Sequence, residues 1–300
     1  MVWGDVVFDV DMEAKMMDQK TKILATLSII LIGLGLLLIS QTQSFGKLRI
    51  IACDVGQGDG LLIITPGGQQ VVVDGGPGTK IVDCLGSKMP FWDRTLELVV
   101  LTHPQKDHLE GLIAVLARYK VKMIATTGVK NETEVFDAWQ KAMDDERAKI
   151  YRPKAGDRLV VDRVAIDVLW PTSQSLDVWQ GQVPKDLNES SIVLRLAFGQ
   201  NCAYLTGDIP KETLQGLIDR PCQILKIAHH GSKTGTNDQV LDAAKPAVAI
   251  IQVGKNSFGH PHKEVLDLLQ SKGVKILRND TNGIIEVVSN GNSYSTKTEE

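Results

Sequence analysis

The segment LTHPQKDHLEG at residues 101–111 decides the fold, because it joins an apolar strand to an apolar helix through a turn rich in metal-binding side chains. His103, Asp107 and His108 can reach two neighbouring points from one turn, since alternate side chains of an extended chain point the same way. A third imidazole would fit at position 105, where the chain has Gln105. Three interpretations follow: a working metal centre, a weakened one, or an ordinary strand-to-helix turn.

Similar side chains follow the other predicted strands of the chain. All six histidines lie in three short segments, a concentration that packing alone does not explain. A pair of divalent cations needs several neutral imidazoles and at least one carboxylate to bridge the ions or balance their charge. We therefore predict a metal centre in which Asp208 bridges and one of the adjacent His229 and His230 is a ligand. The residues at the remaining strand ends are Asp74, His260 and His262.

Each of these residues also has a structural explanation when it is considered alone. Asp107 is followed by Glu110 in a pattern typical of a helix N-terminal cap,. Asp208 precedes a predicted helix that it would cap, and Asp74 stands before two glycines and fits a turn. The histidines of the GHPH segment at 259–262 fit a loop. Only the joint pattern supports the metal interpretation.

Length and composition set broad limits on the protein. The 300 residues, of which 43% are apolar, suffice for one large domain or two small ones,. A net charge of -3 creates no global field that attracts nucleic acid, so polyanion binding requires a local patch,. The spacing of the four cysteines fits neither a zinc ribbon nor a dense disulfide framework,. Cys53 and Cys202 lie in apolar runs and are expected to be small core residues, and a bridge remains open.

The N-terminal region contains a long apolar segment. Residues 23–39 are nearly all apolar, and no charge occurs between Lys22 and Lys47. As a helix, such a segment covers most of a hydrocarbon layer about 30 Å thick. A single membrane anchor is the main interpretation, and a cleaved signal peptide and a buried core helix are the alternatives. Three basic residues precede the segment and two follow it, which favours a cytoplasmic N-terminus and an extracytoplasmic domain,.

The predicted organisation is therefore a tail at 1–22, an anchor at 23–40, a linker at 41–46, a domain at 47–291 and a C-terminal tail at 292–300. Within the domain, strands and helices alternate in a mixed α/β pattern. Two sheets packed face to face with helices outside suit this pattern, and ligands on strand ends would meet at one edge. The main predicted helices are 108–119, 132–145, 210–220 and 263–273. The main predicted strands are 48–55, 60–66, 69–76, 96–103, 121–127, 158–171 (a hairpin), 190–199, 201–208, 223–232, 246–254 and 275–291.

Eight motifs that occur in order along the chain carry a family resemblance. They are DVGQGDG (54–60), VVVDGG (71–76), LTHPQKDHLEG (101–111), LNESSIVLRL (187–196), YLTGD (204–208), LKIAHHGSK (225–233), NSFGHPH (256–262) and RNDTNGII (278–285). Over residues 47–290 the chain resembles the metallo-β-lactamase fold, in the ComEC-type branch of DNA-uptake competence proteins. The resemblance implies an αββα sandwich, a dinuclear metal site at one edge and hydrolysis by water. For this branch it implies a nuclease or phosphodiesterase acting on DNA at the cell surface.

The chain departs from the family pattern at the first metal site. The family has a histidine where this chain has Gln105, and the resemblance places Asn188 nearest to the position of another missing histidine. Amide oxygens bind Zn²⁺ less well than imidazole does and suit Mn²⁺ or Mg²⁺ better. We therefore expect one firm cation held by Asp107, His108, Asp208 and His230, and a weaker one, such as Mn²⁺, beside His103. Asp208 also argues against an antibiotic lactamase, where a thiolate often stands at this position.

The functional hypothesis is a metal-dependent phosphodiesterase, anchored in a bacterial cell membrane, that acts on DNA. Asp107 would orient the nucleophile and act as base, and His262 or His260 would donate a proton to the leaving oxygen or contact phosphate. Four lysines next to the motifs would contact phosphate, with a solvated rim as the alternative: Lys106, Lys226, Lys233 and Lys255. The rival hypotheses are an ester, lactone or lactam hydrolase of the same fold, and a degenerate DNA-binding module.

Overall fold

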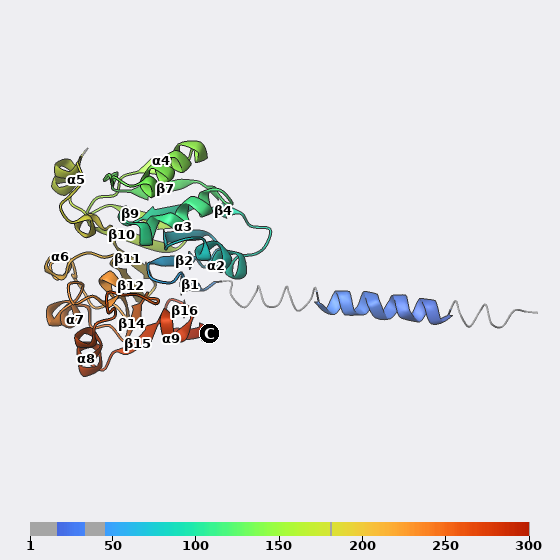
Figure 1. Cartoon of the computed structure of the whole chain (residues 1–300). Helices are drawn as coiled ribbons and strands as arrows, with labels where there is room; N and C mark the ends of the chain where they lie inside the picture. Colours follow the sequence, from blue (N-terminus) through green and yellow to red (C-terminus); the bar gives the residue numbers. More distant parts are fainter. Residues whose placement is uncertain (1–16, 34–45, 181, 300) are drawn as a thin grey trace, which may run out of the picture. The chain divides into compact units, whose positions relative to one another are not determined.

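The structure is a computed structural model that describes residues 17–33, 46–180 and 182–299 (Figure 1). The chain divides into two units, Met1–Phe45 and Gly46–Glu300. In the first unit, residues 17–33 are helical. The predicted anchor at 23–40 extends over residues 34–40, which lie outside the described residues, as do 1–16 of the predicted tail and 41–45 of the predicted linker. No helix within the described ranges has the length and apolar character needed to cross a membrane.

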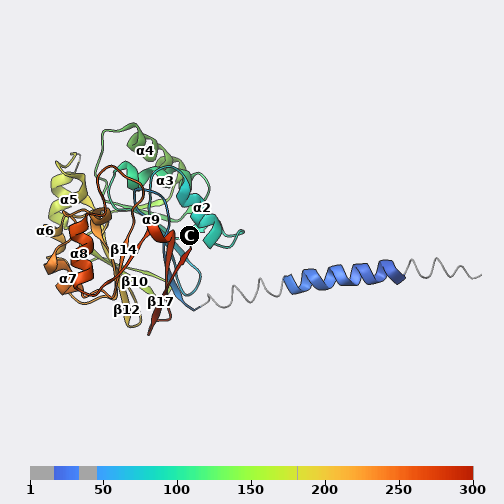
Figure 2. The same cartoon turned by 60° about the horizontal axis from the view of Figure 1, so that its bottom comes forward.

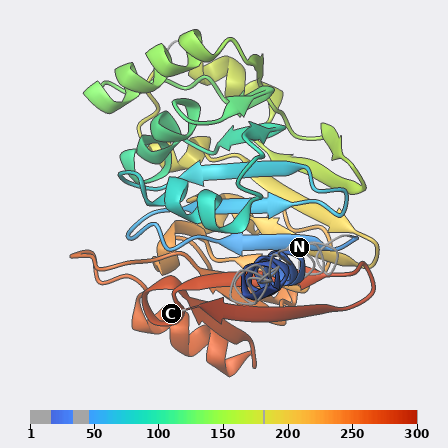
Figure 3. The same ribbon diagram turned by 90° about the vertical axis from the view of Figure 1, so that its right-hand side faces the viewer.

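The second unit contains two large β-sheets (Figures 1 and 3). The eight-stranded sheet has the order β17 (Tyr294–Glu299), β16 (Ile284–Ser289), β1 (Leu48–Ala52), β2 (Gly60–Ile64), β3 (Gln70–Gly75), β5 (Leu98–Leu101), β7 (Met123–Thr126), β8 (Lys149–Tyr151). The seven-stranded sheet has the order β15 (Lys275–Arg278), β14 (Val248–Ile251), β13 (Ile224–Lys226), β12 (Asn201–Leu205), β11 (Val193–Phe198), β10 (Val164–Trp170), β9 (Arg158–Val161). A small pair joins β4 (Thr95–Leu96) to β6 (Lys120–Val121). Figure 3 places the start of the domain beside its end, because β1 pairs with β16.

Three apolar layers explain why these elements stack as they do. Alternate residues of a strand face opposite sides of its sheet, so Ile50 contributes to the layer between the sheets and Ile51 to the layer under the helices. The outer layer of the eight-stranded sheet packs against α2 (Lys80–Lys88), α3 (Lys106–Leu116) and α4 (Glu134–Glu146). The other sheet packs against α6 (Lys211–Leu214), α7 (Asp238–Ala244) and α8 (Lys263–Ser271) (Figure 2). The predicted sandwich of two sheets between helices is confirmed.

Several local features differ from the predictions. Residues 294–299, expected in a C-terminal tail, form the edge strand β17 against β16. Their polar composition does not indicate a strand, because an edge strand is partly exposed to solvent and tolerates polar residues. The predicted helix at 210–220 is only the single turn α6, since Gly216 follows it closely. The predicted strand at 223–232 ends after β13 and continues as the turn Ala228–Gly231. The helices α2, α5 (Ser173–Trp179) and α9 (Asn279–Asn282) were not expected.

The four cysteines form two disulfides, Cys53–Cys84 and Cys202–Cys222. The first joins the end of β1 to α2, and the second joins β12 to the segment before β13. Cys53 is a buried core residue as expected, Cys202 is partly buried, and the bridge that the sequence left open is formed at both residues. The pairing depends on contacts 31 and 20 residues apart in sequence, which spacing alone does not determine,.

A close contact between two glycines seats α3 on the end of β3. A Cβ atom added to Gly111 would lie 2.0 Å from the carbonyl oxygen of Gly75, and Gly111 N donates to the carbonyl of Gly76 at 2.9 Å. Any side chain at Gly75 or Gly111 would push the helix away from the sheet. The contact brings the first turn of α3, which carries Asp107 and His108, to the carboxyl end of β3.

Candidate metal centre

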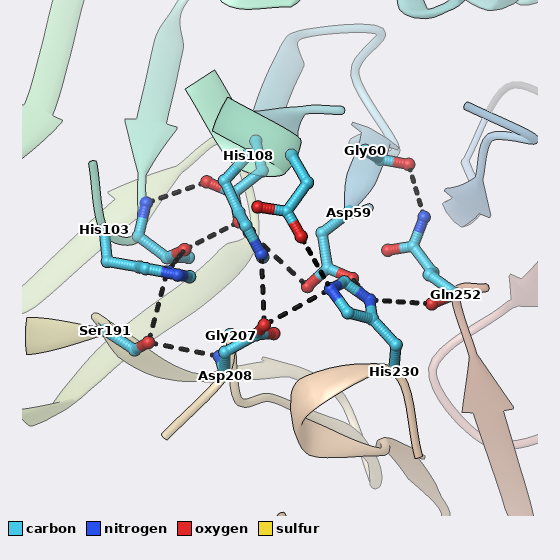
Figure 4. Close-up of polar contacts among 12 residues, drawn as sticks. Asp59, Gly60, His103, His108, Ser191, Gly207, Asp208, His230 and Gln252 are labelled. Atoms are coloured by element: carbon cyan, nitrogen blue, oxygen red, sulfur yellow. Dashed lines mark hydrogen bonds and ion pairs between the residues drawn. The ribbon is translucent and has the colours of Figure 1, made fainter. Parts of the chain in front are cut away.

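The predicted metal-binding residues follow the carboxyl ends of strands in both sheets. β3 and β5 run parallel in one sheet, and β12, β13 and β14 run parallel in the other. The carboxyl ends of parallel strands meet at one edge of a sheet. Asp74 lies at the end of β3, His103 follows β5, Asp208 follows β12 and His230 follows β13. The edge shared by the two sheets therefore gathers the candidate ligands (Figure 4).

Four of these side chains form a tight cluster: Asp107, His108, Asp208 and His230. One ligand atom from each lies within 4.8 Å of all the others. Oδ2 of Asp208 is 3.3 Å from Nε2 of His108 and 3.2 Å from Nε2 of His230. Nε2 of His230 is also 3.3 Å from Oδ2 of Asp107. Asp107 is about one-third exposed, whereas the other three are buried.

Apart from their contacts with one another, three atoms that face the centre of this cluster have no hydrogen-bond partner among the described residues. They are Nε2 of His108, Nε2 of His230 and Oδ2 of Asp208. A buried polar atom without a partner costs free energy, so such atoms are rare in folded proteins. A divalent cation accepts imidazole nitrogens and carboxylate oxygens in this combination. The donor set and its unpartnered atoms therefore fit a divalent cation.

The opposite nitrogens of the two histidines are fixed by hydrogen bonds. Nδ1 of His108 lies 2.8 Å from Oδ2 of Asp74, and Nδ1 of His230 lies 2.8 Å from the carbonyl oxygen of Gln252. Both acceptors take an N–H from the ring, which leaves the Nε2 lone pair directed at the cluster. Metal-binding histidines in proteins are typically oriented in this way. Asp74 therefore orients the ring of His108.

His103 lies at the side of the cluster. Its ring centroid is 4.1 Å from that of His108, and its buried Nε2 has no hydrogen-bond partner in the part of the chain that the structure describes. Its Nδ1 lies 3.1 Å from the hydroxyl of Thr102 and 3.3 Å from that of Ser191. Ser191 also accepts from the backbone N–H of Asp208 at 3.1 Å, so it links the two residues. The side of the site near His103 thus contains fewer charged donors than the Asp107–His108 side.

The expectation for Lys226 is wrong, because this lysine is not at the surface. It is 1% exposed, and its ammonium group pairs with Asp59 and donates to the carbonyl of Gly207 at 2.8 Å. It also lies 3.5 Å from Oδ1 of Asp208. Asp59 in turn lies 3.3 Å from Nδ1 of His230. Lys226 is therefore an internal cation beneath the cluster and does not contact phosphate.

Asp59 belongs to the DVGQGDG segment and had no predicted role. Its backbone N–H donates to the carbonyl of Asp107 at 3.1 Å. This approach requires glycine at position 58, where a Cβ would lie 2.2 Å from the same carbonyl oxygen. Two signals in the sequence could have indicated this buried pair. They are a carboxylate between two glycines before a buried strand, and a lysine inside an apolar strand.

Charges within the site shift several pKa values. Burial alone would lower the pKa of His108 and of His230, but Asp208 and the neighbouring carboxylates raise both well above the usual value. Burial alone would raise the pKa of Asp208, but the charges of His230, His108 and Lys226 lower it well below its usual range. Burial and the neighbouring His108 lower the pKa of His103 to about 3. The carboxylates and the imidazoles of the site thus attract one another electrostatically.

The capping explanations for the two aspartates are wrong. The N-cap residue of α3 is Gln105, and Asp107 lies inside the first turn. The N-cap residue of α6 is Pro210, two residues after Asp208. Neither carboxylate therefore serves as the cap of its helix, which leaves both free for the cluster.

A cleft of about 440 Å³ opens onto the cluster. Six predicted residues besides the buried ligands line it, and they are Gln105, Lys106, Asp107, Asn188, His229 and His260. Gln57, Pro77, His230 and Phe258 complete its wall. Of the adjacent histidines, His230 joins the cluster, whereas His229 only lines the cleft and contacts the hydroxyl of Thr234 at 3.2 Å.

Three predicted residues lie away from this cleft wall. His262 is the N-cap residue of α8, and its ring lies 4.9 Å from that of His260, which is the histidine that reaches the cleft. Lys233 and Lys255 are exposed but do not line the cleft.

Comparison with known proteins identifies relatives of the chain. A sequence model of the metallo-beta-lactamase superfamily matches residues 53–255. ComE operon protein 3 of Bacillus subtilis (strain 168) is 32% identical over 268 residues, covering 81% of this chain and 33% of that protein. Recombination protein 2 of Haemophilus influenzae is 28% identical over 257 residues, covering 80% of this chain and 29% of that protein. The chain thus spans about a third of the length of these curated relatives.

Solved structures share the fold at low sequence identity. The metallo-beta-lactamase fold protein YhfI from Bacillus subtilis superposes with a TM-score of 0.55 at 12% identity, covering 80% of this chain and 99% of that one. CmlA, a diiron beta-hydroxylase from Streptomyces venezuelae, superposes with a TM-score of 0.52 at 13% identity, covering 84% and 54%. At these identities the similarity establishes the architecture alone.

Proposed function

The chain belongs to the metallo-beta-lactamase superfamily, and we propose that it is a metal-dependent phosphodiesterase that cleaves DNA. The observation that carries the proposal is the buried cluster of Asp107, His108, Asp208 and His230, whose unpartnered atoms fit a divalent cation. Similarity to ComE operon protein 3, and to competence protein ComA of Neisseria gonorrhoeae over 34% of the chain, supports DNA as the substrate.

The proposed chemistry assigns separate roles to the residues of the site. A divalent cation, Mn²⁺ or Zn²⁺ with Mg²⁺ as a further candidate, would polarise a phosphoryl oxygen and lower the pKa of water. His108, His230 and Asp208 are proposed to hold it, with Asp208 also facing His103 as the bridging carboxylate of a second, weaker site. Asp107 is partly exposed to the cleft, so its carboxylate can accept a proton from the attacking water and orient it.

Of the two histidines in the GHPH segment, His260 is the one that lines the cleft. Burial and the neighbouring His229 lower the pKa of His260 to about 4, so its ring is neutral at pH 7. A neutral ring donates a hydrogen bond to a phosphate oxygen through N–H but is a poor proton donor. We propose this phosphate contact for His260, together with Lys106 at the cleft wall. Lys233, Lys255 and His262 are left with a peripheral role.

The cellular setting is part of the same proposal. We propose that residues 23–40 anchor the chain in the bacterial membrane with the domain outside the cytoplasm. The two disulfides support an oxidising compartment, since disulfides form and persist there,. Protease added to intact cells would then degrade the domain, and a protected domain would contradict this orientation.

A cleavage assay tests the activity. Purified protein is incubated with single- and double-stranded DNA in Mn²⁺, Mg²⁺ or Zn²⁺, beside a variant that combines Asp107→Ala with His108→Ala. We expect cleavage by the wild type, no cleavage by the double variant, and retained cleavage by Asp267→Ala, a matched change on the exposed face of α8. Equal activity of wild type and double variant would refute the site.

A small-molecule hydrolase is the second candidate, because the cleft volume of about 440 Å³ lies in the range of small-ligand pockets,. Activity on esters or lactones without activity on DNA would favour it. The third hypothesis is a DNA-binding module without catalysis. Protein that binds DNA but contains no metal after careful preparation would favour it. Metal content is measured by inductively coupled plasma mass spectrometry on the same samples.

A further inference from the structure

The loop between β14 and α8 holds an aromatic ring in solvent at the mouth of the cleft. Phe258 is 67% exposed and lines the same cleft as Asp107 and His230. Single exposed apolar residues are common on proteins and need no explanation by themselves. This one differs in two respects, which are the bracing of its loop and its position beside the proposed metal centre.

A single asparagine braces the loop. The side-chain N–H₂ of Asn256 donates to the carbonyls of Gly254 at 2.9 Å and His260 at 2.8 Å. Its side-chain oxygen accepts from the backbone N–H groups of Phe258 at 3.0 Å and His260 at 3.1 Å. The four hydrogen bonds of Asn256 thus fix the path of the backbone. Phe258 is therefore exposed on a loop whose conformation is held by hydrogen bonds.

The ring of Phe258 lies one side chain away from the cluster. Its centroid is 5.7 Å from that of His260, with the two planes inclined by 31°. The centroid of His260 is in turn 6.5 Å from that of the cluster residue His230. A strand whose phosphate contacts His260 therefore has the neighbouring base within reach of the Phe258 ring.

We propose that Phe258 is a stacking platform for an unpaired nucleobase next to the scissile phosphodiester, so that the substrate is single-stranded DNA. This inference rests on the proposed phosphodiesterase function. Aromatic side chains bind single strands without sequence preference, because every base has a flat face that can stack on a ring. In a duplex those faces are covered by neighbouring base pairs, and exposing one requires unstacking.

Binding measurements on the full chain test the inference. Fluorescence anisotropy with a labelled twelve-residue oligothymidine, in Ca²⁺ in place of Mn²⁺, measures Kd for the wild type, Phe258→Ala, Phe258→Trp and Phe258→Leu. We expect Phe258→Ala and Phe258→Leu to weaken binding by about 5- to 150-fold, the range for loss of one stacked base, and Phe258→Trp to retain it. The matched control is Phe91→Ala, which removes another strongly exposed phenyl ring, on the loop before β4.

A second probe separates stacking from other effects. A single strand of the same length that carries abasic sugars keeps the phosphates and lacks the bases, so the difference between wild type and Phe258→Ala should shrink to less than twofold. An undiminished difference on the abasic strand, an equal loss on duplex DNA, or a similar loss in Phe91→Ala would overturn the inference. Wild-type protein that cleaves DNA with no effect of Phe258→Ala would refute the platform and leave the phosphodiesterase intact, whereas wild type that neither binds nor cleaves DNA would refute the proposed function itself.

Discussion

Asp74 and His108, 34 residues apart in sequence, meet at a distance of 2.8 Å between Oδ2 and Nδ1. Asp74 is held in turn by the backbone N–H of Thr102 at 2.8 Å and the hydroxyl of Thr102 at 2.7 Å. This chain of contacts directs Nε2 of His108 towards Asp208. An aspartate near the end of β3 thus positions a candidate metal ligand on α3.

Asp74→Ala should therefore weaken metal binding without removing a proposed ligand. Loss of the orienting carboxylate is expected to raise Kd for Mn²⁺ or Zn²⁺ by about 10- to 100-fold. Competition with a fluorescent chelator measures this affinity. Asp83→Ala, on the exposed side of α2, serves as the control and should bind as the wild type does. An unchanged Kd in Asp74→Ala would mean that the contact does not orient His108.

The buried ion pair of Lys226 and Asp59 should show strong energetic coupling. Removing one partner leaves an uncompensated buried charge, so Lys226→Met and Asp59→Asn are each expected to lower the free energy of unfolding by about 3–5 kcal/mol. The combined variant should lose clearly less than the sum, because no isolated charge remains. Urea denaturation in EDTA measures all three.

The control for this ion pair is Lys263→Met, which removes one partner of an exposed pair with Asp267 on α8. Exposed pairs contribute little, so a change within about 0.5 kcal/mol is expected. Additive losses in the combined variant of Lys226 and Asp59 would contradict their coupling.

A pH-dependent contribution to stability should come from Asp167, away from the proposed metal centre. Its hydrogen bond with Arg158 lowers the pKa of Asp167, and Arg195 adds to this against the opposing effect of burial. Because the pKa is lower in the folded state, the charged carboxylate stabilises the fold at pH values above its ordinary pKa of about 3.8. This contribution is lost as the pH falls through the lowered pKa of the folded state. Asp167→Asn should therefore cost about 1–3 kcal/mol at pH 7 and much less at pH 2–3.

Urea denaturation of wild type and Asp167→Asn at pH 7, 5 and 3, in EDTA, measures the difference. Asp177→Asn, in α5 and outside this ion-pair group, is the control. A difference between wild type and Asp167→Asn that stays constant with pH would show that hydrogen bonding without charge accounts for the effect.

The two disulfides should differ in what their removal changes. Replacing both cysteines of either pair by serine is expected to lower the free energy of unfolding by about 2–5 kcal/mol. Cys53 directly precedes the DVGQGDG segment that carries Asp59, so removal of Cys53–Cys84 should also weaken metal binding. Removal of Cys202–Cys222, at the opposite end of β12 from Asp208, should leave the metal affinity unchanged. If the variant without Cys53–Cys84 and the variant without Cys202–Cys222 bind metal with equal affinity, the link between the first disulfide and the site is contradicted.

Much of the site follows from the order of residues along the chain. His103, Asp107, His108 and Asp208 come directly after apolar strands, and parallel strands carry their carboxyl-end residues to one edge. The pattern of apolar residues fixes which segments are strands, so it predicts that these residues lie at the carboxyl edges of the sheets. The sequence also shows directly that position 105 carries an amide side chain and no imidazole.

Contacts across the sandwich were decided only by the tertiary structure. Lys226 looks like a surface cation next to a motif, yet it points into the interior, because the side of a strand that faces the site depends on register between sheets. Three further results depend in the same way on distances between segments far apart in sequence. His230 and not His229 joins the cluster, His260 and not His262 lines the cleft, and each cysteine has one particular partner. Local pattern determines which residues stand at a strand end, and only the packing of the two sheets determines which atoms meet there.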